Sequence, residues 1–206
     1  MRNILKWTLS VVLLLSGLSL TSCQEDEKAL PQTARLTASE EATLLHMREE
    51  EKLARDVYQH LGAKYGLPIF SNIAASEQRH VDFVLNVMAE YAVEDKSSDE
   101  AGLFTLPELQ ALYQALTEKG DSSLLDALWV GATIEELDIK DLNEAIGNTH
   151  NADLIDLYEL LRCGSGNHIQ AFIRQIEGQG AVYVPKYISQ DELDAILAGG
   201  HQACSL

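Results

Sequence analysis

A glutamate and a histidine lie three residues apart inside a strongly apolar stretch of the chain. The segment "FSNIAASEQRHVDFVLNVMAEY" contains Glu77 and His80, and at the period of an α-helix both fall on its apolar face. A buried carboxylate without a partner is costly. A metal ion would be a suitable partner, because Glu and His at positions i and i+3 can reach the same ion.

Three further predicted helices interrupt their apolar stripes in the same way. The first carries Glu51, with Tyr58 two turns later, the third carries Glu135 and Asp138, and the fourth carries His168. A single buried histidine is more often a satisfied core residue, and a single glutamate often marks a misplaced register. Four interruptions near the middles of four helices instead indicate one common site, since antiparallel helices bring their midpoints to a similar level.

Clustered carboxylates repel one another, so the predicted site requires cations. Carboxylate oxygens and imidazole nitrogens suit iron or manganese, with zinc as a further option, and one or two ions would fit the pattern. Tyr58 is a candidate for a hydrogen bond to a ligand or for electron transfer. The predicted metal ligands are Glu51, Glu77, His80, Glu135, Asp138 and His168.

The segments that must position these residues are helical, because apolar residues recur every three or four positions and almost no segment alternates. The pairs Thr37–Glu40 and Thr105–Glu108 match the capping-box pattern of a helix start. Long helices are predicted over about 39–64, 69–93, 122–147 and 151–177, with short ones at about 106–118 and near the C-terminus. The sequence therefore predicts an all-α antiparallel four-helix bundle with an extra short helix between long helices two and three.

The N-terminus reads as a targeting segment. The basic "MRNILK" precedes the apolar "WTLSVVLLLSGLSL", which is short for a membrane span. The following "LTSC" resembles a lipobox, which implies cleavage before Cys23 and its lipidation; a plain secretory signal is the alternative. The predicted organisation is a lipoprotein signal peptide (1–22), a lipidated tether (23–38), the bundle (39–180) and a C-terminal extension (181–206). The expected location is the bacterial cell envelope, outside the cytoplasm.

The charge of the chain restricts its partners. The net charge of −17 becomes −19 once residues 1–22, with Arg2 and Lys6, are removed. Such acidity argues against binding nucleic acid or an anionic membrane surface through a basic patch, so membrane contact is expected through the lipid anchor only. A disulfide between Cys163 and Cys204 is left open, and so is a homodimer.

Several short motifs together resemble a known superfamily. "EKLARDVY" (51–58), "EQRH" (77–80) and "EELD" (135–138) are similar to ligand motifs of rubrerythrins. The longer runs "YGLPIFSNIAASEQRH" and "VGATIEELDIKDL" resemble an uncharacterised bacterial ferritin-like domain family. The resemblance covers about residues 40–178. It implies a ferritin-like bundle with an iron or manganese carboxylate site and oxidoreductase chemistry on peroxide, oxygen or ferrous iron.

One departure from the family pattern concerns the fourth helix. "SGNH" (165–168) has Ser165 where the resemblance predicts a glutamate, which leaves open a mononuclear or a dinuclear site. The rubredoxin module of rubrerythrins is absent from the sequence, so redox activity would need an external electron donor. The alternative function is a non-catalytic structural or ligand-binding helical-bundle lipoprotein with a degenerate metal site.

Neighbouring acids and histidines are weaker candidates. Glu49 and Glu50 flank Glu51 but point in other directions on a helix, so they are predicted to be solvated. Glu135 is favoured over Glu136 as a ligand. His46 is predicted to lie at the surface.

Overall fold

The computed structural model describes residues 35–205. The predicted signal peptide, Cys23 and most of the predicted tether lie outside the described residues. Within the described part there are six helices and no strand: α1 (Ala38–Tyr65), α2 (Pro68–Glu90), α3 (Pro107–Gly120), α4 (Leu124–Gly147), α5 (Ala152–Gly178) and α6 (Gln190–Gly199). The all-α prediction is confirmed for this part of the chain. None of these helices is long and apolar enough to cross a membrane.

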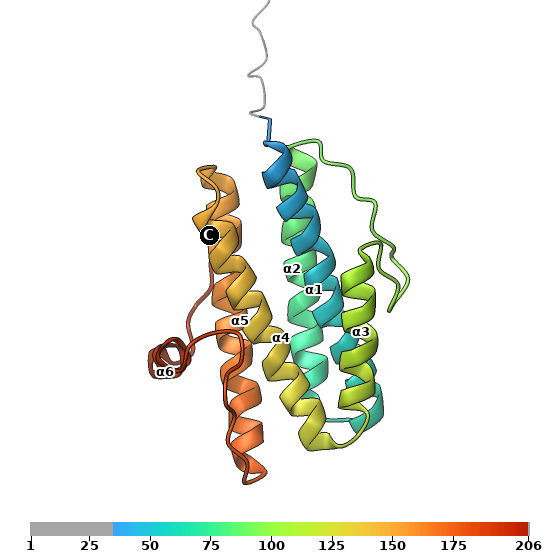
Figure 1. Cartoon of the computed structure of the whole chain (residues 1–206), viewed down its shortest axis with the longest axis vertical. Coiled ribbons are helices and arrows are strands. Elements are labelled where there is room, and N and C mark those ends of the chain that lie inside the picture. Colours follow the sequence, from blue (N-terminus) through green and yellow to red (C-terminus); the bar gives the residue numbers. More distant parts are fainter. Residues whose placement is uncertain (1–34, 206) are drawn as a thin grey trace, which may run out of the picture. The chain divides into compact units, whose positions relative to one another are not determined.

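The four long helices form two antiparallel hairpins that pack side by side (Figure 1). Helix α1 packs chiefly on α2 and helix α4 chiefly on α5, while α1 also contacts α4 and α2 also contacts α5. Short connections join the members of each hairpin. The long connection between the hairpins contains α3, which packs against α1 and α4. A helical bundle with one long crossover results.

Local sequence signals explain where most of the helices begin. Thr37 and Glu40 form the predicted capping box, in which the Glu40 N–H donates to Thr37 Oγ1 at 3.2 Å and the Thr37 N–H donates to Glu40 Oε2 at 2.8 Å. Ser123 and Asn151 cap α4 and α5. Helix α1 ends at Gly66, which adopts a φ of 64°, a conformation that favours glycine.

The predicted capping box at Thr105 and Glu108 is wrong. Helix α3 begins after Leu106, whose side chain makes no capping bond. The carboxylate of Glu49, far away in the sequence, replaces the local cap: it accepts bonds from the Thr105 N–H at 2.8 Å, the Thr105 hydroxyl at 2.6 Å and the Leu106 N–H at 2.8 Å. A negative charge at this position also suits the positive end of the α3 dipole.

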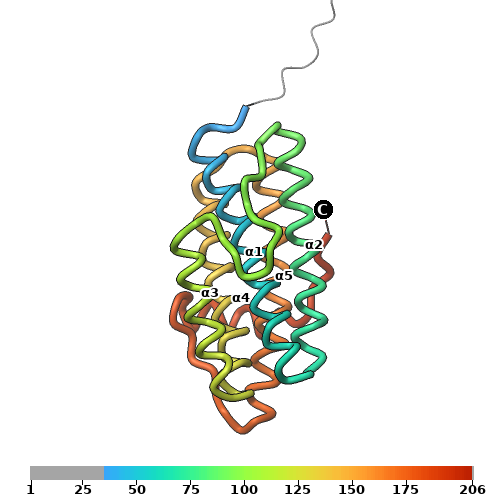
Figure 2. The backbone as a smooth tube through the Cα atoms, turned by 90° about the vertical axis from the view of Figure 1, so that its right-hand side faces the viewer, coloured from blue at the N-terminus to red at the C-terminus, as the bar shows by residue number. Residues whose placement is uncertain are grey.

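The connection 91–106 covers a face of α1 that carries many charges. Figure 2 shows this connection running along α1 on its way to α3. Lys52 is fully buried there and donates to Asp56 at 2.6 Å and to the carbonyl of Glu100 at 2.8 Å. Arg48 pairs with Asp95 at 2.9 Å. Both cationic side chains thus pair with a nearby carboxylate, which offsets the cost of burying their charge.

The apolar core has two parts, one toward each end of the long helices. One cluster includes Val57, Phe70, Leu128 and Phe172, and the other includes residues such as Leu44, Val84, Leu142 and Leu161. In α1, α2 and α5, the predicted ligand positions fall between the residues of these two clusters; in α4, Ile139 of the first cluster follows Glu135 and Asp138, and the second cluster begins at Leu142. The bundle therefore encloses a polar layer between two apolar layers.

Candidate metal centre

The polar layer contains all six side chains that the sequence predicts as metal ligands. Glu51 comes from α1, Glu77 and His80 come from α2, Glu135 and Asp138 come from α4, and His168 comes from α5. Each is at most 8% exposed. The four long helices thus place these polar residues at the same height in the bundle.

Glu77 lies at the middle of this arrangement and faces both histidines. Its Oε1 lies 2.7 Å from Nδ1 of His168, and its Oε2 lies 2.7 Å from Nδ1 of His80. Glu51 Oε2 approaches the His80 nitrogen at 3.1 Å, and Glu135 Oε2 approaches the His168 nitrogen at 3.4 Å. Each imidazole nitrogen is therefore flanked by two carboxylates, of which one is always Glu77.

Two groups of three side chains could each hold a metal ion, and they share Glu77. One consists of Glu51, Glu77 and His80, and the other of Glu77, Glu135 and His168; the ligand atoms of each group lie within 4.8 Å of one another. The two imidazole rings are stacked with their centroids 5.5 Å apart. The geometry thus corresponds to two adjacent positions joined by one carboxylate.

Several buried atoms of the polar layer form no hydrogen bond. Neither oxygen of Glu77 has a hydrogen-bond partner, and the same holds for Oε2 of Glu135, Nδ1 of His168 and both oxygens of Asp138. Unpaired polar atoms are costly when they are buried. The ligand atoms of each group lie close enough to reach a common ion, so the donor set fits one or two cations.

The electrostatics of the cluster also favour added positive charge. Among residues 35–205, no lysine or arginine forms an ion pair with Glu51, Glu77, Glu135 or Asp138. Burial raises the pKa of the Glu51 carboxyl to about 7, although His80 opposes the shift. Burial and then the charge of Glu77 raise the pKa of Glu135.

The two histidines supply positive charge within the cluster, whereas the carboxylates supply negative charge. Burial by itself would lower the pKa of His168, but the carboxylates of Glu77 and Glu135 outweigh it and raise that pKa to about 10. The pKa of His80 is likewise well above its ordinary value because of Glu77 and Glu51. Burial would raise the pKa of Glu77, yet the two imidazolium groups lower it. Protons on the imidazoles thus supply positive charge that metal ions could replace.

Asp138 is the predicted ligand that belongs to neither group of three. It is buried on the same face of α4 as Glu135, and neither of its oxygens has a hydrogen-bond partner. Burial, followed by the charges of Glu50 and Glu51, raises its pKa well above the usual range. Asp138 therefore lies about one turn from Glu135 on α4 and outside both groups of three.

Small residues and a tyrosine shape the surroundings of the cluster. Tyr58 donates a hydrogen bond of 2.5 Å to Glu135 Oε1, and burial and the charge of Glu135 keep its pKa well above the ordinary value. A Cβ atom at Gly164 would lie 2.5 Å from two atoms of the His80 ring, so only glycine lets this ring approach α5. Ser165, at the predicted glutamate position, is buried and donates to the Leu161 carbonyl at 3.2 Å.

Two of the acids predicted to be solvated are buried. Glu49 and Glu50 are 1% and 5% exposed, because the connection 91–106 and α4 cover the faces of α1 that periodicity assigns to solvent. Glu49 caps α3. Glu136, the weaker candidate beside Glu135, is also buried, where it accepts bonds from the Tyr183 hydroxyl and the Ile188 N–H.

A pocket of about 590 Å³ reaches the histidines from outside the bundle. Its lining includes His80 and His168 together with Arg79 and Arg174, and the C-terminal residues 201–204 form a further wall. A disulfide between Cys163 and Cys204 fixes this terminal segment to α5, which resolves the pairing that the sequence left open. Pockets of this size commonly admit small molecules.

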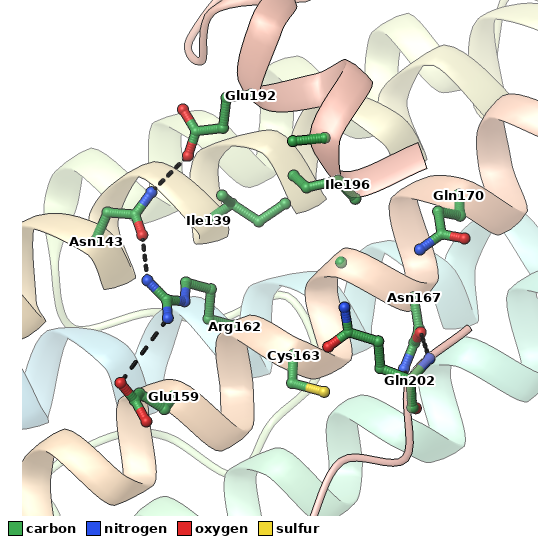
Figure 3. A pocket seen from close by; sticks show the side chains of 12 residues that line it. Ile139, Asn143, Glu159, Arg162, Cys163, Asn167, Gln170, Glu192, Ile196 and Gln202 are labelled. Atoms are coloured by element: carbon green, nitrogen blue, oxygen red, sulfur yellow. Dashed lines mark hydrogen bonds and ion pairs between the residues drawn. The ribbon is translucent and has the colours of Figure 1, made fainter. Parts of the chain in front are cut away.

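A second pocket, of about 460 Å³, lies between α4, α5 and α6 and is separate from the cluster (Figure 3). Asn143 connects its walls by donating to Glu192 at 2.8 Å and accepting from Arg162 at 2.8 Å. None of the predicted ligands lines it. Its bridged polar groups hold α6 against the bundle.

The fold and the site define a class: a helical-bundle protein with adjacent buried carboxylate–histidine groups that could bind metal ions. The family described as Uncharacterized protein domain (DUF2202) matches residues 40–200, and the chain belongs to this family. The Uncharacterized protein MJ0754 of Methanocaldococcus jannaschii is 48% identical over 164 residues, which cover 79% of this chain and 89% of the relative. The crystal structure of hypothetical protein MJ0754 from Methanococcus jannaschii matches with a TM-score of 0.81 and 46% identity, covering 84% of this chain and 99% of that one. These similarities establish kinship and fold rather than an activity.

Proposed function

We propose that the chain binds two transition-metal ions, iron or manganese, in the polar layer and uses them in redox chemistry with a small oxidant such as peroxide or oxygen. The observation that carries the proposal is Glu77, whose two oxygens face two histidines at 2.7 Å and have no hydrogen-bond partner. Glu51 and His80 would complete the ligands of one ion, and Glu135 and His168 those of the other.

The charges of the site support two ions rather than one. Glu51, Glu77, Glu135 and Asp138 carry four negative charges when ionised, which two divalent cations would balance with both imidazoles neutral. The oxygen and nitrogen donors suit iron and manganese, and zinc remains an option for a non-redox role. Ser165 does not supply a carboxylate, so Asp138 and water would complete the coordination.

Reduction of a peroxide to water takes two electrons, and two such ions would supply one each. The side chains around them would bind, orient and protect. Tyr58 keeps its proton and orients Glu135 by its hydrogen bond. The pocket beside His80 and His168 would admit the oxidant, and the apolar layers would exclude bulk water from the other sides. An external electron donor would return the electrons.

The resemblance to ferritin-like proteins and, more distantly, to rubrerythrins supports this proposal. The two hairpins with one long crossover suit a ferritin-like bundle. We further propose that Cys23 carries a lipid anchor and that the protein lies in the cell envelope. The disulfide supports a location outside the cytoplasm, since disulfides persist in oxidising compartments.

Anaerobic titration with ferrous iron, followed by addition of peroxide, tests the proposal. About two ions should bind per chain in the buried centre, and peroxide should oxidise them with the electron count of its reduction to water. Sub-stoichiometric iron uptake at every pH, with no other transition metal retained on purification, would refute it. For the anchor, Cys23→Ala should release the protein from the membrane fraction.

The alternative is a non-catalytic bundle in which the same residues form only a polar network. The observation that favours it is that protonated His80 and His168 can pair with Glu77 without any metal ion. Replacing Glu77 and His80 together by leucine separates the two functions. A double variant that is as stable as the unsubstituted protein, combined with no metal uptake by the latter, would favour the structural role.

A further inference from the structure

A third group of potential ligands lies between α1 and α4, apart from the two groups already described. His46, Glu50 and Asp141 each offer one ligand atom, and the three atoms lie within 4.8 Å of one another. His46 Nε2 is 3.7 Å from Glu50 Oε2. The group combines one imidazole with two carboxylates, a donor set that suits divalent transition metals.

The buried member of this group is an unpaired acid. The side chain of Glu50 is 7% exposed, and its Oε2, the atom that faces His46, has no hydrogen-bond partner. A buried carboxylate oxygen without a partner is costly. Its direction toward an imidazole nitrogen and a second carboxylate is what a bound cation would explain.

The other two members of the group reach the surface. His46 and Asp141 line a pocket of about 380 Å³, together with Glu144. Lys140 pairs with Asp141 at 2.6 Å and with Glu144 at 3.0 Å, so an incoming ion would compete with this ammonium group for Asp141. An ion from solvent can therefore meet His46 and Asp141 first and Glu50 beneath them.

Acidic side chains continue from this group to the buried centre. Asp141, Asp138 and Glu135 follow one another at three-residue intervals on α4, so each step rises by about 4.5 Å on the same side of the helix. On α1, Glu50 is adjacent in sequence to Glu51. Asp138 interacts electrostatically with Glu50, Glu51 and Glu135 and has two unpaired oxygens.

We propose that His46, Glu50 and Asp141 form an outer binding site for a divalent transition-metal ion, from which Asp138 passes ions to the buried centre. The binding of the outer ion stands on the geometry of the three residues alone. The transfer to the buried centre rests on the proposed function of that centre.

Manganese(II) is a suitable probe of the outer site. Equilibrium dialysis followed by elemental analysis should show one ion fewer per chain in Asp141→Asn and in His46→Gln than in the unsubstituted protein. Both residues are partly exposed, so neither substitution should disturb the core. Glu144→Gln is the matched control, because it removes one charge from the same opening outside the group of three and should retain the ion.

The rate of loading tests the transfer. In anaerobic stopped-flow mixing with ferrous iron, Asp141→Asn should fill the buried centre at least about tenfold more slowly than Glu144→Gln, because both variants lose one negative charge from the opening but only Asp141→Asn lacks the outer site. The final occupancy of the buried centre should be the same in both variants. Loss of the outer ion without a change in loading rate would overturn the transfer.

The Glu77→Gln variant separates this inference from the proposed function. With the buried centre weakened, one manganese ion should still bind and should disappear when Asp141→Asn is added. Equal manganese content with and without Asp141→Asn would overturn the outer site, whatever the buried centre does. An outer ion in a protein whose buried centre never fills would uphold the outer site and refute the proposed function.

Discussion

The sharing of Glu77 between two groups makes a specific prediction for Glu77→Gln. Glutamine has nearly the same shape as glutamate but carries no charge, so the substitution preserves volume in the bundle. Both oxygens of Glu77 face a histidine nitrogen at 2.7 Å. The substitution should therefore weaken the binding of both ions, whereas Glu51→Gln should weaken mainly the ion at His80, and Glu135→Gln mainly the ion at His168.

The size of the effect follows from the distance and the burial. A unit charge about 2.1 Å from a divalent cation, an ordinary carboxylate–metal distance, interacts by roughly 16 kcal/mol at an effective dielectric constant of about 20. Desolvation offsets most of this, and removing one member of a buried charge pair typically costs about 3–5 kcal/mol. At about 1.4 kcal/mol per factor of ten, Glu77→Gln should weaken the binding of each ion by roughly 10²- to 10⁴-fold.

Anaerobic calorimetry with ferrous iron or manganese measures the pattern directly. Thermal unfolding of the three metal-free variants should accompany it, so that a loss of fold is not mistaken for a loss of ligand. If Glu77→Gln bound both ions with unchanged affinity, the shared carboxylate would have no role in metal binding. If Glu51→Gln abolished the binding of both ions equally while Glu77→Gln left the binding of one ion unchanged, the grouping of ligands would be wrong.

Three further predictions concern pH, packing and the disulfide. Metal binding must displace the proton of His168, whose pKa is about 10, and must ionise Glu51, whose pKa is about 7. The affinity for metal ions should therefore rise at least about tenfold per pH unit between pH 7 and 9 and should fall further below pH 7. Competition titrations at several pH values measure this dependence. Gly164→Ala should displace the His80 ring and selectively weaken one ion, whereas Gly166→Ala, whose Cβ would meet nothing closer than 3.9 Å, should bind both; equal metal contents in these variants would contradict the packing argument. Reduction of the disulfide between Cys163 and Cys204, which joins residues 41 positions apart, should lower the free energy of unfolding by about 2–4 kcal/mol in denaturant melts. It should also speed the entry of small oxidants in stopped-flow traces. An unchanged melt would show that fixing the C-terminal segment contributes nothing to stability.

The helices and the buried positions of the candidate ligands were predictable because both depend on local periodicity. Apolar residues at three- and four-residue spacing indicate a helix and its buried face, and Glu77 or His168 on that face is an exception visible in the sequence. Antiparallel packing then brings such exceptions together. Periodicity could not identify the ring of His80 as the neighbour that requires a glycine at position 164.

The features that were missed depend on contacts between distant segments. Helical periodicity alone gives α1 one buried face and so predicts that Glu49 and Glu50 are solvated, whereas the connection 91–106 and α4 cover its remaining faces. The local pattern predicts a capping box of Thr105 and Glu108 at the start of α3, but Glu49 supplies the cap from another helix. His46 and Asp141 have ordinary surface positions in their own helices, and only the packing of α1 on α4 joins them to Glu50.

The metal content of the buried centre tests the central claim most directly. Asp141→Asn is the form to use, because it lacks the proposed outer site and leaves the buried ligands intact. Anaerobic titration with ferrous iron, followed by gel filtration and elemental analysis, should yield about two ions per chain, and adding Glu77→Gln should remove both. Retention of no transition metal at any pH from 7 to 9, by a protein that remains folded, would contradict the account.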